Sequence, residues 1–194
     1  MSRDDPRTAT VVPDALRDPG IKLLGRVEEK MVEQLRDALD EADPDRDLAI
    51  ELTTQGGDAE LGRRMALEIA RARKRRTGRL LFLGKTEVYS AGVTVMGAFP
   101  RADRFLTRDC VLLIHCRQLD ETVELQGPLR ASLPKLKALC LELEMGIALE
   151  KESFEQLLAG SEVPMDELLE RALHNWYLRA DEALERKLVA GLVE

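Results

Sequence analysis

Apolar residues recur along this chain with two different periods. The first is a spacing of four, seen at Val27, Met31, Leu35 and Leu39, which predicts an amphipathic helix with a narrow apolar stripe. The second is a set of short apolar runs bounded by turn residues, which predict strands at 21–24, 48–52, 79–83, 104–106 and 111–114. Further helices are expected at about 58–73 and 90–99. This alternation of strands and helices favours an α/β fold with a largely parallel sheet.

The pattern of the second half of the chain predicts mostly helices. A long helix is expected from about Ser132 through the 150s, closed by Gly160, with its glutamates, Glu150 among them, on an outer face. A helix of this length exceeds what one small domain needs, so we expect it to project or to pack against another subunit. Two final helices are expected at about 164–176 and 180–187.

The domain organisation follows from the prolines and the length. Residues 1–20 hold three prolines and several charges and are expected to form a flexible N-terminal arm. Residues 21–194 are expected to form a single domain, in which the long helix and its approach occupy about 116–162.

Composition narrows the classes of partner. The net charge of −7 and an aromatic content of 4% argue against nucleic acid. The three cysteines form no CxxC pair and no signal-like apolar core precedes the domain, so a reduced, cytoplasmic setting is expected. No apolar run approaches the length of a membrane span. Two histidines and scattered cysteines give no metal-ligand spacing, and we expect neither a metal nor another cofactor.

Candidate chemistry gathers where predicted strands end. In a parallel sheet these ends share one edge, and Gly56-Gly57, Ser90 and His115 each follow a strand. A serine needs a base to become a nucleophile, and the carbonyl that it attacks needs N–H donors. We therefore expect Ser90 as nucleophile, His115 as base, and the N–H groups of Gly57 and Ala91 as an oxyanion hole. Taken singly, a serine at this position is more often a helix N-cap, and only the joint arrangement with His115 and the double glycine favours a nucleophile.

The same residues carry a resemblance. The order Thr54-Gln55-Gly56-Gly57, then Ser90, then the apolar run that ends at His115 resembles the ClpP family, the proteolytic ring subunits of an ATP-dependent protease. The 25-residue step from Ser90 to His115 is the family's spacing. Further similar segments include Ile21-Lys22-Leu23-Leu24-Gly25 and the run from Tyr177 to Ala183, so that the likeness covers about residues 21–190.

This resemblance implies a ClpP/crotonase-like α/β spiral of β-β-α units with a long projecting handle helix. It implies a serine-type endopeptidase that acts on polypeptides, in a ring of its own copies or two stacked rings, fed by an AAA+ unfoldase. The family's third triad residue is an aspartate, and an ungapped alignment on Tyr177 places Arg171 there. The role of orienting His115 through its other ring nitrogen would then pass to Glu170 or Asn175.

Two other functions are kept open. The first is a ring subunit without catalytic activity, with a structural or regulatory role. Arg171 cannot accept a hydrogen bond from His115 as an aspartate would, and Tyr89 would narrow the pocket. The second is an acyl-thioester enzyme of the crotonase type, which shares the fold and an oxyanion hole. That enzyme would not need the pair Ser90 and His115, so it ranks last.

Overall fold

The computed structural model describes residues 12–119 and 122–194 and contains one sheet. Its strands are β1 (Ile21–Leu24), β2 (Leu48–Thr54), β3 (Leu80–Tyr89), β4 (Arg104–Thr107), β5 (Val111–Ile114), β6 (Trp176–Arg179) and β7 (Gly191–Val193). The main path runs β1-β2-β3-β4-β7, with every neighbouring pair parallel. Strand β5 pairs with β3 in parallel and with β6 in antiparallel orientation.

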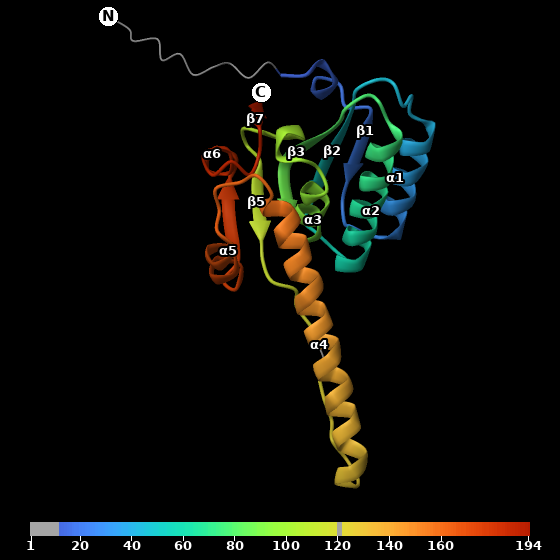
Figure 1. Ribbon diagram of the computed structural model, residues 1–194, viewed down its shortest axis with the longest axis vertical. Coiled ribbons are helices and arrows are strands. Elements are labelled where there is room, and N and C mark those ends of the chain that lie inside the picture. The colour runs from blue at the N-terminus through green and yellow to red at the C-terminus, as the bar shows by residue number, and fades with distance from the viewer. Residues whose placement is uncertain (1–11, 120–121) are drawn as a thin grey trace, which may run out of the picture.

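Six α-helices lie between and beyond these strands in the described residues (Figure 1). They are α1 (Glu29–Glu41), α2 (Ala59–Arg75), α3 (Ala91–Gly97), α4 (Leu129–Leu158), α5 (Met165–Ala172) and α6 (Ala180–Glu185). Two 3-10 turns, η1 (Asp14–Leu16) and η2 (Arg101–Asp103), complete the set. The expected α/β architecture with a largely parallel sheet is confirmed.

Strand β3 has two different neighbours along its length. Phe82–Gly84 pairs with β4, whereas Glu87–Tyr89 pairs with β5. Between these halves Thr86 takes a φ of 57° beside a register shift against β2, as expected of a bulge that bends a strand. The bend carries the end of β3, and with it Ser90, to the side of β5.

Both faces of the sheet are covered. The larger core lies under α1, α2 and α3 and takes in the stripe of α1, of which Leu35 is fully buried. The smaller core packs Leu16 of η1 against Ala49, Leu81 and Phe105. Of the predicted N-terminal arm, residues 1–11 lie outside the described residues. The rest of it, from residue 12 to residue 20, contains the buried Leu16.

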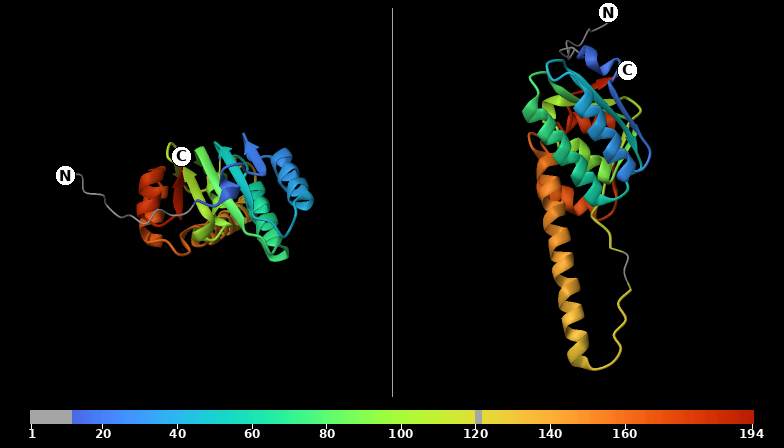
Figure 2. Two further views of the ribbon diagram at one scale, coloured as in Figure 1. Left: turned by 90° about the horizontal axis from the view of Figure 1, so that it is seen from above. Right: turned by 90° about the vertical axis from the view of Figure 1, so that its right-hand side faces the viewer.

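Helix α4 projects from the body as a single long element (Figures 1 and 2). The part of α4 from Leu129 to Ile147 carries apolar side chains that are more than a third exposed, namely Leu129, Leu133, Leu136, Leu141, Leu143, Met145 and Ile147. The helix begins three residues before the predicted start, so Pro134 lies inside it rather than in its first turn. Within the described ranges no helix combines the length and apolarity that crossing a membrane requires.

Some predicted boundaries are wrong. The expected helix to about Trp176 ends at Ala172, and Trp176–Arg179 is a strand paired with β5. Strand β7 was not predicted. Both errors have one cause: short strands such as these are stabilised by pairing with partners distant in sequence, and local periodicity does not record that pairing.

Candidate active site

Ser90 occupies a strained turn between β3 and α3. Its φ of 54° and ψ of −115° lie in a region that residues other than glycine rarely adopt. The residue precedes α3, yet its side chain makes no capping hydrogen bond, so a role as helix N-cap does not account for it. A serine on a strained strand-to-helix turn is also how hydrolases expose a nucleophile.

The double glycine lies directly against this serine. A Cβ built on Gly56 would stand 2.7 Å from the Cβ of Ser90 and 3.3 Å from its Oγ. Gly57 forms a parallel bridge with Val27, in which the bonds run from Val27 N–H to Gly56 and from Asp58 N–H to Val27. In such a bridge the polar groups of Gly57 itself point away from Val27. Within the described residues the Gly57 N–H finds no protein acceptor.

His115 follows the last residue of β5, next to the turn that holds Ser90. The Ser90 N–H donates to Leu113 at 2.9 Å, and Tyr89 is in register with Leu113, so the serine and the histidine leave neighbouring strands at the same edge. The Nδ1 atom of His115 lies 2.6 Å from the carbonyl oxygen of Cys116. A carbonyl can only accept, so this bond places the proton on Nδ1 and leaves Nε2 with a free lone pair. No hydrogen bond joins Ser90 to His115 in the described chain.

The structure does not bring the two candidates for the third position into the cleft. Glu170 and Asn175 are exposed and make no side-chain hydrogen bond within the described residues. Arg171, at the aligned position, binds Glu167 at 2.9 Å and stacks over the Trp176 ring at 5.0 Å. From this region the cleft is lined instead by Leu169 and Leu173.

A cleft of about 1010 Å³ connects these elements. Its lining near the double glycine and Ser90 includes Gln55, Gly56, Gly57, Glu60, Ser90, Ala91, His115, Cys116, Arg117 and Glu150. Its apolar lining includes Val93, Ile114, Leu143, Met145, Ile147, Phe154 and Leu157. The cleft is thus lined by the predicted serine and histidine and by Gly57 and Ala91, the two residues whose N–H groups are the predicted donors. Tyr89 is not among its lining residues and packs edge-on against Tyr177, 5.9 Å away.

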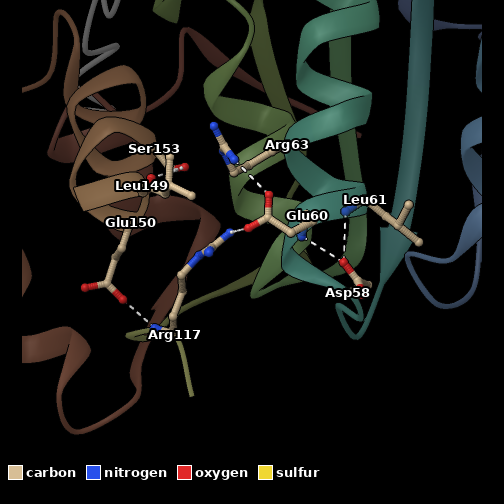
Figure 3. A network of polar contacts seen from close by, with 8 residues as sticks. All are labelled: Asp58, Glu60, Leu61, Arg63, Arg117, Leu149, Glu150 and Ser153. Carbon is tan, nitrogen blue, oxygen red and sulfur yellow. Dashed lines mark hydrogen bonds and ion pairs between the residues drawn. The ribbon is translucent and has the colours of Figure 1, made fainter. Parts of the chain in front are cut away.

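A polar network around Arg117, two residues after His115 in the chain, borders the cleft (Figure 3). The Arg117 guanidinium donates to Glu60 of α2 at 2.7 Å, while its backbone N–H donates to the Glu150 carboxylate of α4. The bond from Arg117 is the main reason why the pKa of Glu60 is lowered. Burial, and then the charge of Glu150, raise the pKa of the neighbouring Cys116 thiol.

Sequence reasoning missed this network. Glu150 was expected on an outer face, but it is only 9% exposed. A signal for its position is present in the chain, because Glu150 stands four residues before Phe154 and seven before Leu157, which are both buried. That spacing puts the three on one face of a helix. Arg117 carries no such signal, because its partners come from α2 and α4.

Among residues 12–119 and 122–194, no three His, Cys, Asp or Glu side chains gather where a metal ion could bind. The polar groups of the cleft are suited instead to acid–base and nucleophilic chemistry.

Comparisons with known proteins show the fold. No protein-family model matches the chain, and no curated protein matches it. Among solved structures it is similar to a mutant of ClpP1 from Listeria monocytogenes, with a TM-score of 0.71 over 90% of each chain and 17% sequence identity. The chain therefore has a ClpP-like fold: a mixed α/β layer with a largely parallel sheet and a long projecting helix.

Proposed function

We propose that this chain is a serine peptidase subunit of the ClpP type, with Ser90 as nucleophile and His115 as general base. The observation that carries the proposal is the backbone of Ser90. A φ of 54° costs about 1–3 kcal/mol, and the Ser90 side chain makes no capping hydrogen bond that would offset this strain. Exposing a nucleophile beside a histidine and a double glycine accounts for it.

The proposed reaction uses the groups that line the cleft. Ser90 Oγ attacks the peptide carbonyl as Nε2 of His115 takes its proton. The oxyanion that forms is stabilised by the N–H groups of Gly57 and Ala91. The imidazolium then gives its proton to the leaving amine, which departs and leaves an acyl-serine ester. Water deprotonated by the same histidine attacks this ester, releases the acid and restores Ser90.

Side-chain contact between Ser90 and His115 is expected to form when a peptide fills the cleft. Catalytic hydrogen bonds are often long in free enzymes and shorten in the substrate complex. The free Nε2 lone pair, which the Nδ1 bond to Cys116 leaves available, is the form of histidine that this step requires.

The exposed apolar side chains of α4 support assembly as part of the same proposal. Contiguous apolar surface of this kind marks contact with other molecules. We propose a ring of identical copies in which α4 contacts a second ring, and to which an AAA+ unfoldase delivers polypeptide. Sedimentation that finds a stable monomer at micromolar concentration would refute the assembly.

A fluorophosphonate probe tests the chemistry. We expect labelling of the wild-type chain, its loss in Ser90→Ala, and a strong reduction in His115→Gln. Ser161→Ala is the matched control, because Ser161 lies outside the cleft and should leave labelling intact. Absence of labelling in a correctly assembled wild-type chain would sink the proposal.

A second function is favoured by one observation. Arg171 is held by Glu167 and Trp176 where the resemblance places an aspartate, and no acidic side chain bonds His115 in the described residues. A ring subunit without activity of its own fits this arrangement. It predicts no labelling in any variant, together with co-assembly with an active relative.

A further inference from the structure

The peptide group between Cys116 and Arg117 connects His115 to a buried carboxylate. Its carbonyl oxygen accepts from Nδ1 of His115 at 2.6 Å. Its N–H donates to the Glu150 side chain (Figure 3). The peptide is trans, and in a trans peptide the C=O and N–H bonds point in opposite directions. One rigid planar unit therefore has the imidazole at one end and the carboxylate of α4 at the other.

Glu150 lies where the charge of its carboxylate can act on the peptide group that it binds. Its side chain is 9% exposed, and no ion pair to a cation is found for it in the described chain. The nearby guanidinium of Arg117 is directed to Glu60 instead. A buried carboxylate without a cation depends on the N–H groups that it binds, and such charge-assisted bonds are about twice as strong as neutral ones.

We propose that Glu150 is a positioning residue for His115, acting through the Cys116–Arg117 peptide group in place of the triad's third member. The inference rests on the proposed role of His115 as general base. Hydrogen bonds in a chain polarise one another, so a carboxylate on the N–H makes the carbonyl at the far end a stronger acceptor. That carbonyl holds the Nδ1–H tautomer before proton transfer. It also stabilises the imidazolium that forms afterwards.

Anchoring the strand end does not by itself require a charge at Glu150. The Cys116 N–H already donates to Ala172, and the Arg117 side chain already holds α2 through Glu60. A neutral amide at position 150 would still accept from Arg117 N–H and would keep the same shape. Glu150→Gln would therefore remove the charge and keep the hydrogen bond that anchors the strand end.

Glu150→Gln is the decisive variant, and Glu155→Gln is its control, because Glu155 is an exposed carboxylate on the same helix. Both are assembled as full-length protein and assayed with a fluorogenic peptide. We expect Glu150→Gln to lower kcat about tenfold, at the lower end of the range found for the outer-shell partners of metal-binding histidines. KM should stay within about twofold, because the loss falls on the transition state. Glu155→Gln should match the wild type.

A second readout does not depend on activity. The chain has two histidines, so the Nδ1–H proton of His115 can be assigned by NMR with a His174→Gln variant. We expect Glu150→Gln to move this resonance upfield, because the bond to the carbonyl weakens, and Glu155→Gln to leave it in place. An unchanged resonance in Glu150→Gln overturns the inference, as does an unchanged kcat in an active enzyme. A wild type that the probe does not label, but whose resonance still responds to Glu150→Gln, would refute the proposed function while the link from Glu150 to His115 stands.

Discussion

Replacing Arg104 with methionine should destabilise the chain by about 3–5 kcal/mol, because it would leave several buried backbone carbonyls without donors, at about 1–3 kcal/mol each. Arg104 is 1% exposed and has no carboxylate partner among residues 12–119 and 122–194. Its five N–H donors meet five backbone carbonyls, those of Gly97, Phe99, Gln156, Leu157 and Leu188. Burial lowers the pKa of Arg104 to about 10, which still leaves the group charged at neutral pH.

The acceptors explain why a lone buried cation is tolerated. Gly97 ends α3, and Gln156 and Leu157 lie in the last turn of α4, where carbonyls have no intrahelical donor and the helix dipole is negative. Arg104 therefore caps two helices and joins the one that follows Ser90 to the one that carries Glu150. Methionine would leave these carbonyls buried without donors, at about 1–3 kcal/mol each, offset in part by removal of the buried charge.

Urea unfolding at matched protein concentration measures the effect. With a slope of about 2–3 kcal/mol per molar, the midpoint should fall by roughly 1.5 M at unchanged slope. Arg104→Lys keeps the charge but offers three donors, so its midpoint should lie between the two. Arg108→Met is the control, since Arg108 is exposed and should tolerate the change. A loss in Arg104→Met no larger than in the control would refute this account of the buried cation.

Three further results are expected. Gly56→Ala would set a Cβ 2.7 Å from that of Ser90 at a φ of 93°, so probe labelling should be lost in a chain that still folds; retained labelling would contradict the close packing. Burial raises the pKa of Cys110 to about 12, so iodoacetamide at mildly alkaline pH should modify it only after unfolding, as peptide mass mapping would report. The bond from Arg117 lowers the pKa of Glu60 below its ordinary value of 4.5, so their pair stabilises the fold above that pH and the effect is lost as the pH falls through the folded value. The stability difference between wild type and Glu60→Gln, below about 1 kcal/mol for so exposed a pair, should vanish in acid; a difference that persists there would contradict this assignment.

The candidate site divides into a part that sequence could predict and a part that it could not. Ser90, His115, Gly57 and Ala91 were predictable because each follows a strand, and parallel strands bring their ends to one edge. The contacts of Arg117 with Glu150 and Glu60 were not, because they join the end of β5 to α4 and α2 across 33 to 57 residues of chain. For Glu150 the spacing to Phe154 and Leu157 indicates a buried face but not its partner. A backbone carbonyl in addition has no signature in sequence, since every residue has one.

The sequence by itself determined the α/β class, the long helix and the strand-end cluster around Ser90 and His115, because periodicity and turn residues are local properties of the chain. Only the tertiary structure decided that Trp176–Arg179 is a strand, that the Ser90 side chain makes no capping hydrogen bond, and that His115 contacts a peptide group whose N–H donates to Glu150. The strand depends on pairing with β5, which is distant in sequence, and the bond from Arg117 to Glu150 exists only once the sheet and α4 have packed together.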